Sequence, residues 1–225
     1  MDTSSVDDFI QFLKQEISPA TLEIGKLDDS SRKHIQKLIY TNLVDRFDTM
    51  VDRSILLNCR EESFSDDALK SADKPVSEAD LYRLLMQGND LQKFLTTRLQ
   101  DGLRNSVLRN RHSLKLKRLL EVVSPDSEGH KQIPRVNIST GDIVDKFKPQ
   151  NKKIPHSVAG YADWLYSRRN SIVHGAGSNK FLDNDQKQIK KIWKTDTTKT
   201  FKISVGSITI ATKFYSNVAE MLKNQ

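Results

Sequence analysis

The amino-acid sequence predicts an all-α protein, a helical bundle with one small β-hairpin near its C-terminus. Apolar residues recur at spacings of three and four along most of the chain, which is the period of amphipathic helices. These segments follow one another without alternating strands, so no parallel α/β sheet is expected. With 225 residues, 36% of them hydrophobic, the chain can build one core. We therefore expect a single domain over 1–225, with a Pro/Lys-rich insertion at about 124–157.

The N-terminal part contains the longest predicted helix. A first helix over 3–18 buries an apolar stripe and is expected to end at Pro19. The second runs from 29 to about 59, with a nearly continuous stripe of apolar residues, and is expected to pack against the helix of 161–177. It also carries Asp45, Asp48 and Asp52. Any of these carboxylates could hold a guanidinium or an imidazole, but a solvated surface pattern is the favoured interpretation.

The middle of the chain is predicted to be helical as well. Residues 60–77 are polar and are expected to form a loop with a helical turn at 66–71. A capping box at Ser77–Asp80 opens a helix to 86. Two further helices are expected over 91–109 and 113–123.

The last hundred residues include the insertion and the hairpin. Four prolines fall within 124–157, where we expect one short helix at 140–147 and where His156 is a second candidate for proton transfer. A helix capped by Asp183 should run to Lys194. Alternation of apolar and polar residues on both sides of Gly206-Ser207 predicts the hairpin over 201–210, followed by a final helix over 211–223.

Composition limits the class of protein. The single cysteine, Cys59, excludes an internal disulfide and favours a reducing compartment. No apolar run approaches the ~20 residues that span a bilayer, and the N-terminus lacks a basic segment before an apolar run, so we expect a cytoplasmic protein. The net charge of +7 combines −7 over residues 1–90 with +14 over residues 91–225. A basic half suits a polyanionic partner such as RNA, although it is equally typical of a solvated face.

The sequence of 161–177, YADWLYSRRNSIVHGAG, is the strongest candidate for a site. Its apolar positions suit a buried helix, yet Arg168, Arg169, Asn170 and His174 are concentrated just before Gly175. In a helix, Asn170 and His174 lie within about 40° of each other, whereas Arg169 and His174 are about 140° apart. The two could converge if the arginine wraps round, if the last turn unwinds toward a left-handed Gly175, or if a two-fold axis pairs two copies of the helix.

An imidazole beside a guanidinium suits RNA cleavage without a metal. Free histidine titrates near pH ~6.5, so much of it is neutral at cytosolic pH and can accept the proton of a ribose 2′-hydroxyl. Arginine keeps its charge and can stabilise the negative charge that develops on the phosphoryl oxygens. The sequence shows no cysteine cluster, metal-binding spacing, Walker pattern or dinucleotide fingerprint, so we expect no metal and no cofactor.

The hexapeptide Arg169-Asn170-Ser171-Ile172-Val173-His174 resembles the Arg-(polar)-x-x-x-His motif of HEPN domains, and Ile-Val-His-Gly is similar to their RiboL-PSP branch. The resemblance implies an all-helical fold in which Arg169 and His174 are catalytic and Asn170 assists. It also implies a homodimer with a composite cleft, an endoribonuclease activity, a role in a toxin–antitoxin module or in defence against phage, and an antitoxin or other regulatory partner.

Basic residues outside the motif suggest where RNA would bind. Arg104-Asn105-Ser106-Val107-Leu108-Arg109 repeats the motif with arginine in place of histidine, so this copy could bind phosphate but could not act as a base. The densest basic cluster begins there. As residues that contact the RNA backbone we expect Arg168, Arg104, Arg109, Arg111 and Lys115.

Two other functions remain open at this point. The chain could be a non-catalytic helical module that binds RNA, a nucleotide or a protein partner. Alternatively, because HEPN domains often neighbour a nucleotidyltransferase, Tyr161 or Tyr166 could be the target of a regulatory modification.

Overall fold

A computed structural model describes residues 1–71, 75–86, 88, 90–123, 134–145, 153–175, 179–197 and 202–224. Within these ranges the chain is mostly helical, so the all-α class is confirmed. The α-helices are α1 (Ser4–Phe12), α2 (Ser18–Glu23), α3 (Asp29–Leu57), α4 (Glu62–Lys70), α5 (Glu78–Met86), α6 (Leu91–Asn105), α7 (His112–Val123), α8 (Val158–Gly175), α9 (Asn179–Trp193) and α10 (Val205–Lys223). Three short helical turns are η1 (Leu13–Ile17), η2 (Ile24–Lys26) and η3 (Val107–Arg109).

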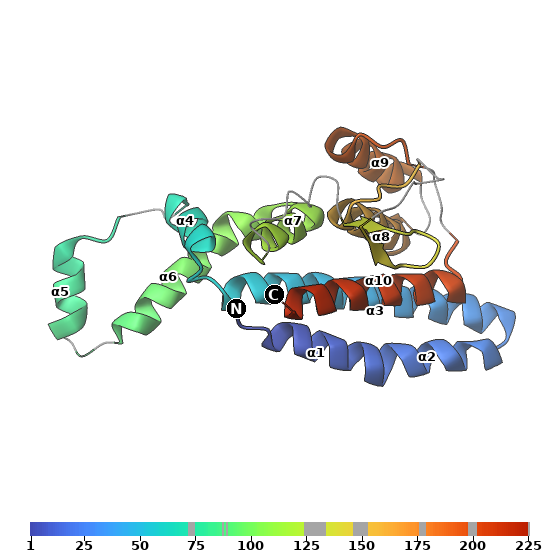
Figure 1. Cartoon of the computed structure of the whole chain (residues 1–225), viewed down its shortest axis with the longest axis horizontal. Coiled ribbons are helices and arrows are strands. Elements are labelled where there is room, and N and C mark those ends of the chain that lie inside the picture. Colours follow the sequence, from blue (N-terminus) through green and yellow to red (C-terminus); the bar gives the residue numbers. More distant parts are fainter. Residues whose placement is uncertain are drawn as a thin grey trace.

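The long helix α3 is the centre of the bundle, and α1, α7, α8 and α10 all pack against it. Figure 1 shows α3 and α10 lying along one another, with α1 and α2 on one side and α7, α8 and α9 on the other. Buried aromatic side chains fill the space between these helices. The rings of Phe47 and Tyr215 stack with centroids 4.1 Å apart, and the Tyr40 hydroxyl donates to the Leu165 carbonyl at 2.9 Å. The expected packing of α3 against the helix of 161–177 is therefore confirmed.

The N-terminal helical segment does not end at Pro19, so this prediction was wrong. The chain passes from α1 through the π-helical turn η1 into α2, whose first turn holds Pro19. Pro19 lies directly after the wider π-helical turn, which interrupts the usual i to i−4 hydrogen-bond pattern and so accommodates a residue that lacks an N–H. The Ser18 hydroxyl also donates to the Leu13 carbonyl at 2.9 Å.

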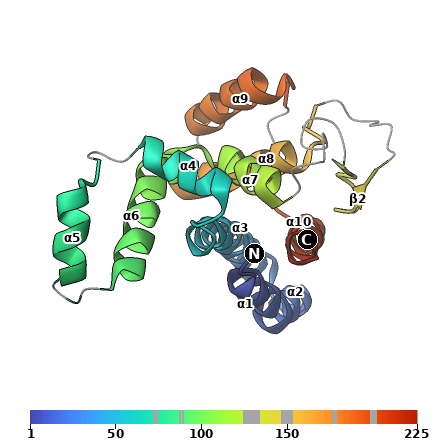
Figure 2. The same ribbon diagram turned by 60° about the vertical axis from the view of Figure 1, so that its left-hand side comes forward.

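Helices α4, α5 and α6 form an arm that projects from the bundle, as Figures 1 and 2 both show. The base of the arm is tightly packed, since a Cβ on Gly102 of α6 would lie 2.4 Å from the Ala68 carbonyl oxygen of α4. In contrast, α5 buries none of its residues. The helix expected over 91–109 is divided at Ser106 into α6 and η3.

The hairpin lies elsewhere than predicted. Residues 205–210 form the start of α10, and Ser204 caps this helix in a capping box with Ser207, so the predicted C-terminal hairpin over 201–210 was wrong. The two-stranded antiparallel sheet of the described residues instead joins β1 (Arg135–Val136) to β2 (Ile143–Val144) inside the 124–157 region. Gly141, with φ of 80°, lies in the turn between them. The helix expected over 140–147 is therefore absent from 140–145, and residues 146–147 lie outside the described residues.

Other boundaries differ modestly from those predicted. Helix α4 begins at Glu62, before the turn expected at 66–71, and α9 begins at Asn179, before the expected cap at Asp183. In the parts of the chain that the structure covers, no helix combines the length and apolar character needed to cross a membrane.

Candidate functional site

The polar end of α8 carries the motif residues Arg169, Asn170 and His174. The chain remains helical through Gly175, so unwinding of the last turn, one of the three ways in which Arg169 and His174 could converge, does not occur before that residue; residues 176–178 lie outside the described ranges. Asn170 and His174 consequently share one side of α8, while Arg169 points about 140° away from His174. The His174 side chain is exposed and Arg169 is 17% exposed, so neither is sealed in the core.

A carboxylate of α3 fixes Arg169. The Nε atom of Arg169 lies 2.6 Å from Oδ1 of Asp45, and Nη2 donates to Oδ2 at 2.9 Å. Nη1 donates to Oδ1 of Asn170 at 3.1 Å. A guanidinium held at all three of its nitrogen atoms has little freedom to rotate. The expectation that Asp45 belongs to a solvated surface pattern was wrong, because this residue faces the motif.

Asn170 connects the motif to α9 and α7. Its Nδ2 donates to Oδ2 of Asp185 at 3.3 Å, and Asp185 accepts from Nη1 of Arg111 at 3.1 Å through its other oxygen. Arg111 also donates from Nε to both oxygens of Asp163, at 2.8 and 3.0 Å. A continuous polar network therefore links the exposed motif to a carboxylate inside the protein.

Asp163 is fully buried and is the inner end of this network. Besides Arg111, it accepts from the Ser113 hydroxyl at 3.0 Å and from Nε1 of Trp193 at 2.9 Å. A buried carboxylate needs such partners because removal from water strongly disfavours its charge. Asp163 thus joins α7, α8 and α9 at one point.

A second charged cluster lies between α3 and α7. Nδ1 of His112 lies 2.7 Å from Oδ1 of Asp48, and Nζ of Lys115 lies 2.9 Å from Asp48 and 2.5 Å from Asp52. Burial by itself would raise the pKa of Asp48, but the hydrogen bond and charge of His112, followed by those of Lys115, lower that pKa to about 2. For Asp52, burial prevails over Lys115 and raises the pKa of the carboxyl. Asp48 and Asp52, like Asp45, are therefore not the solvated residues that the sequence favoured.

Tyr166 of α8 joins the two clusters. Its ring stacks on His112 with centroids 4.5 Å apart and an interplanar angle of 7°. The guanidinium of Arg169 lies 5.7 Å from the centre of the same ring. Burial raises the pKa of Tyr166, so its hydroxyl is neutral at physiological pH. Tyr161, by contrast, is only 1% exposed, which shields it from a modifying enzyme.

The five arginines and lysines expected to bind RNA do not form one surface. Arg168 is 5% exposed; it donates to the Lys202 carbonyl at 2.7 Å and lies over the Trp164 ring at 4.8 Å. Lys115 is also 5% exposed and Arg111 is held by two carboxylates, so contact with RNA would require these buried ion pairs to break. Arg168 and Lys115 are therefore buried and Arg111 is only partly exposed, while contact of these three residues with RNA stays a prediction.

Arg104 and Arg109 are exposed, but they lie on different elements. Arg104, in α6, pairs with Asp101 at 2.7 Å, and Arg109, at the end of η3, donates to Asn105 at 2.9 Å. The hexapeptide that repeats the motif in the sequence is therefore not one continuous helix. It does not reproduce the geometry of the α8 motif.

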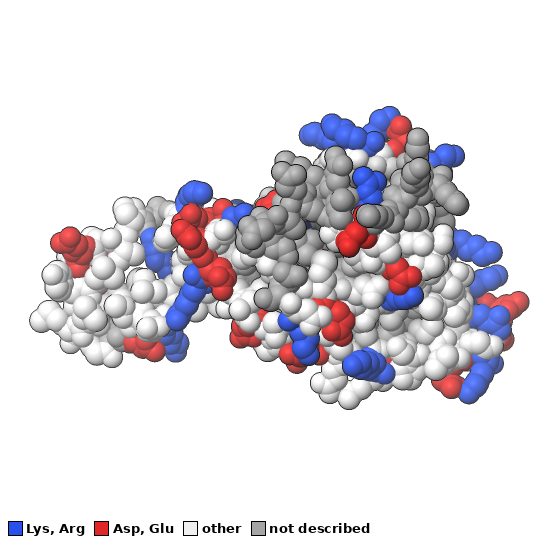
Figure 3. Space-filling view, viewed as in Figure 1, with Lys and Arg blue, Asp and Glu red and all other residues white. Residues whose placement is uncertain are grey.

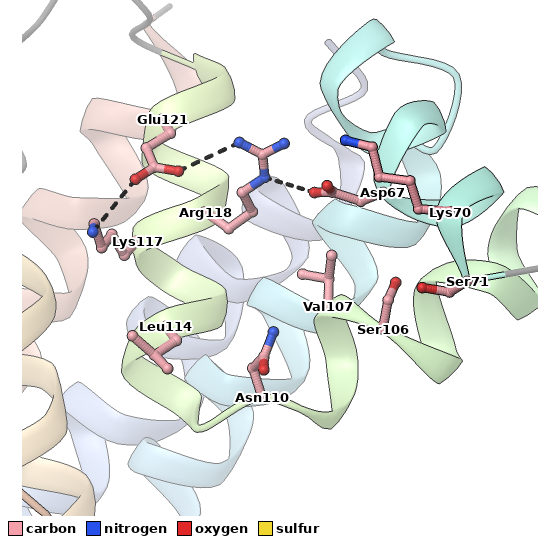
Figure 4. Close-up of a pocket in the computed structure, with 10 residues that line it drawn as sticks. All are labelled: Asp67, Lys70, Ser71, Ser106, Val107, Asn110, Leu114, Lys117, Arg118 and Glu121. Atoms are coloured by element: carbon pink, nitrogen blue, oxygen red, sulfur yellow. Dashed lines mark hydrogen bonds and ion pairs between the residues drawn. The ribbon is translucent and has the colours of Figure 1, made fainter.

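The next basic residues along α7 face the arm. A cleft of about 510 Å³ lies between α4, η3 and α7, and Figure 4 shows Arg118 at its edge. Arg118 pairs with Asp67 at 2.8 Å and with Glu121 at 3.4 Å, while Lys117 lies 3.6 Å from Glu121. The basic cluster of the sequence thus points in several directions, and carboxylates compensate much of its charge.

His156, the second candidate for proton transfer, is bound to the small sheet. Its Nδ1 lies 3.2 Å from the Val136 carbonyl oxygen, and its own carbonyl accepts from the Val136 N–H at 2.7 Å. Among the described residues, no group of three or more histidine, cysteine, aspartate and glutamate side chains is arranged to hold a metal ion.

The sequence interpretation missed Asp163 and Asp185 as parts of the site. Asp163 had a usable signal, because a lone carboxylate among the apolar residues of a buried helix requires a cationic partner. Asp185 had no such signal, since its position two residues after Asp183 suggests only the start of a helix. Nothing in the local sequence distinguishes Asp45 from the other carboxylates of α3.

Comparisons with models of known protein families, with curated proteins and with solved structures found no match to this chain.

Proposed function

We propose that this chain is a metal-independent endoribonuclease of the HEPN type, with His174 as the base, Arg169 stabilising the phosphoryl charge and Asn170 assisting. The observation that carries the proposal is the arrangement at the end of α8. Arg169 and Asn170 are held by Asp45 and Asp185, while His174 is exposed to solvent one turn beyond Asn170. Fixed polar groups next to an exposed imidazole are the elements that acid–base cleavage of a phosphodiester requires.

The proposed reaction uses the nucleophile that RNA itself provides. Neutral His174 takes the proton of a ribose 2′-hydroxyl, and the 2′-oxygen attacks the adjacent phosphorus. The bond from phosphorus to the 5′-oxygen breaks, and this oxygen takes up a proton. The products are a 2′,3′-cyclic phosphate and a 5′-hydroxyl. DNA has no 2′-hydroxyl and should not be cleaved.

A two-fold pair of chains would complete the site. Because α8 is helical through Gly175, Arg169 and His174 of one chain diverge by about 140°. A second α8 placed across a two-fold axis would bring the arginine of one chain near the histidine of the other. We therefore include a homodimer with a composite cleft in the proposal.

The reaction products test the proposed chemistry. Purified protein incubated with total RNA in EDTA should release fragments that end in 2′,3′-cyclic phosphate, and His174→Ala should not. His34→Ala, which removes an exposed imidazole from α3, is the matched control and should cleave normally. Cleavage that requires an added divalent metal, or fragments with 3′-hydroxyl ends, would exclude this mechanism.

Mixing two inactive variants tests the composite cleft. If each cleft takes its arginine and its histidine from different chains, a mixture of Arg169→Ala and His174→Ala proteins should form some dimers with one intact pair. Activity should then return in the mixture after subunit exchange. A mixture as inactive as its components would contradict a cleft shared in this way.

The pairing of Arg169 with Asp45 favours one other function, a non-catalytic module that binds RNA, a nucleotide or a protein partner. The carboxylate compensates part of the charge that catalysis would use. Such a module would retard RNA in a salt-dependent way and leave it intact.

The biological setting of the proposed enzyme follows from the same resemblance. We include a cytoplasmic toxin or phage-defence effector, restrained by an antitoxin or another regulatory partner. If a neighbouring transferase modifies the chain, the half-buried Tyr166 is the better candidate than Tyr161, and a mass increase on Tyr166 after co-expression would support such regulation.

A further inference from the structure

Three lysines of α9 and Lys194, which directly follows the last residue of this helix, form a stripe that faces away from α8. Lys187, Lys190, Lys191 and Lys194 recur at spacings of three and four, which places them within about 100° of one another around the helix. All four are exposed. The opposite side of α9 carries Asp185, Ile189 and Trp193, which contact the rest of the protein. Figure 3 shows blue side chains gathered at the top of the molecule, where Figure 1 places α9.

A small hollow lies beside this lysine stripe. Its volume is about 280 Å³, and it is lined by Asp183, Gln186, Lys187, Lys190, Asp196 and Thr197. Two of the lining groups, Nε2 of Gln186 and Oγ1 of Thr197, are shielded from solvent and make no hydrogen bond. Shielded donors without a partner are unusual in folded proteins, so a ligand rich in hydrogen-bond acceptors would suit this place.

The carboxylates of the hollow do not prevent an anion from binding. Nζ of Lys190 lies 2.6 Å from Asp196, but both side chains are largely exposed. Exposed ion pairs contribute little and are easily exchanged for another partner. The other three lysines of the stripe form no ion pair among the described residues. The stripe therefore retains positive charge, unlike Arg111 and Lys115, whose charges are compensated inside the protein.

The helix that carries the lysine stripe, α9, is hydrogen-bonded to the helix that carries the motif, α8. Asp185 accepts the hydrogen bond of Asn170, and Trp193 reaches Asp163 near the other end of α8. From Lys187 to Lys194 the stripe extends about 10 Å along α9, at a rise of about 1.5 Å per residue. A strand cleaved at the end of α8 could continue along α9.

We propose that the lysine stripe, together with the hollow beside it, binds the phosphate backbone of the RNA, an inference that rests on the function proposed above. Lysines supply the charge, while Gln186 and Thr197 donate to phosphate oxygens. Contacts of this kind position a strand without reading its bases, so affinity should depend strongly on salt and little on sequence.

The test measures binding in the absence of cleavage. The parent protein is His174→Ala in EDTA, and the ligand is a labelled single-stranded RNA. Replacing Lys187, Lys190, Lys191 and Lys194 with alanine should weaken binding at least tenfold near 50 mM salt. The slope of log affinity against log salt should fall by about 2 to 3, since each contact to single-stranded nucleic acid contributes ~0.7.

The matched control removes the same charge elsewhere. Lys14, Lys26, Lys33 and Lys37 are exposed on η1, η2 and α3, and their replacement with alanine changes the net charge equally. This variant should keep the affinity of the parent within about twofold. A third variant, Gln186→Leu with Thr197→Val, leaves the charge unchanged and should weaken binding by several-fold without changing the salt slope.

The result is independent of whether the wild-type protein cleaves RNA, because the parent lacks His174. Equal losses in the two lysine variants would overturn the inference, as would a parent that does not bind RNA. It would also be overturned if the stripe variant lost binding to anionic lipid vesicles but kept its affinity for RNA.

Discussion

At the scale of single residues, the buried carboxylate of Asp163 organises the site. It accepts hydrogen bonds from Arg111, Ser113 and Trp193, and Arg111 in turn reaches the partner of Asn170. Loss of one member of a buried ion pair leaves the other charge without compensation. The position of the motif therefore depends on a residue that has no contact with solvent.

We expect Asp163→Ala to lower the free energy of unfolding by about 3 kcal/mol, because the buried Ser113 and Trp193 donors lose their acceptor and Arg111 keeps only Asp185 as a counter-charge. Urea denaturation measures the change. Arg111→Met combined with Asp163→Leu should recover only part of the loss, since the apolar pair removes two buried charges but leaves Asp185 with Asn170 as its partner. The exposed pair of Arg104 and Asp101 provides a control, and Asp101→Ala should have little effect.

The lowered pKa of Asp48 predicts that the stability of the fold depends on pH. Its pKa in the folded protein, about 2, lies below the ordinary value of 3.8, so the ionised carboxylate stabilises the fold by about 2 kcal/mol at neutral pH. This contribution should disappear as the pH falls from about 4 to about 2. Asp48→Asn should therefore be less stable than the wild type at pH ~7, with a difference that narrows toward pH ~2.

Urea denaturation of the two proteins at several pH values would measure this difference. A gap between wild type and Asp48→Asn that stays constant from neutral to acid pH would contradict the assignment. It would mean that the asparagine changes packing rather than removing a stabilising charge.

The sequence revealed the motif residues but not their partners. Arg169, Asn170 and His174 could be recognised because their spacing within one helix is a local property. The partner of Arg169 is Asp45, which is 124 residues away in the chain. Which face of α3 meets α8 is decided by the packing of the whole bundle, and the three aspartates of that helix look alike in the sequence.

At the scale of secondary-structure elements, long helices were predictable and short elements were not. Helix α3 was expected to end near residue 59 and ends at Leu57, because its apolar period extends over many turns. Residues 201–210 were misinterpreted because Ser204, Gly206 and Ser207 suit both a hairpin turn and a helix N-terminus. The capping box and the burial of Ile208 and Ala211 favour a helix that begins at Val205.

Two glycines test how closely the helices pack. A Cβ on Gly102 would lie 2.4 Å from the Ala68 carbonyl oxygen, and backbone atoms cannot easily move away. We expect Gly102→Ala to lower the free energy of unfolding by about 1–3 kcal/mol, as measured by thermal or urea denaturation.

Gly206→Ala is the matched control for this substitution. Its Cβ would meet only the Ser204 Oγ, at 3.8 Å, in the first turn of α10. The change should stabilise the protein by about 0.4–1 kcal/mol, because alanine restricts the unfolded chain. A stable Gly102→Ala protein would show that α4 and α6 are less tightly packed than described.

The arm provides a prediction about local stability. Helix α5 buries no residue, and Tyr82, Leu85 and Met86 are 65%, 55% and 87% exposed. Elements with few buried contacts open locally at low cost. Amide hydrogens of α5 should therefore exchange with solvent much faster than those of α3 in a hydrogen-exchange experiment. Equal protection of the two helices would contradict this description.

At the scale of the whole molecule, the charge separation of the sequence becomes internal pairing. The acidic first part supplies Asp45, Asp48 and Asp52 on α3, and the basic remainder supplies Arg169, His112 and Lys115. Much of the positive charge that suggested RNA binding is thereby compensated. In the lysine stripe of α9 only Lys190 pairs with a described carboxylate, the exposed Asp196, so the stripe keeps most of its positive charge. We therefore assign the backbone contacts to that stripe.

The central claim is that His174 and Arg169 act together on a phosphodiester. The most direct test is the rate of cleavage of one RNA oligonucleotide in EDTA by wild type, His174→Ala, Arg169→Ala and the control His34→Ala. We expect His174→Ala and Arg169→Ala each to cleave at least about 100-fold more slowly than the wild type, in keeping with the contribution of acid–base catalysis. The control should match the wild type. Unchanged cleavage by His174→Ala, or wild-type protein that leaves the RNA intact, would contradict the claim.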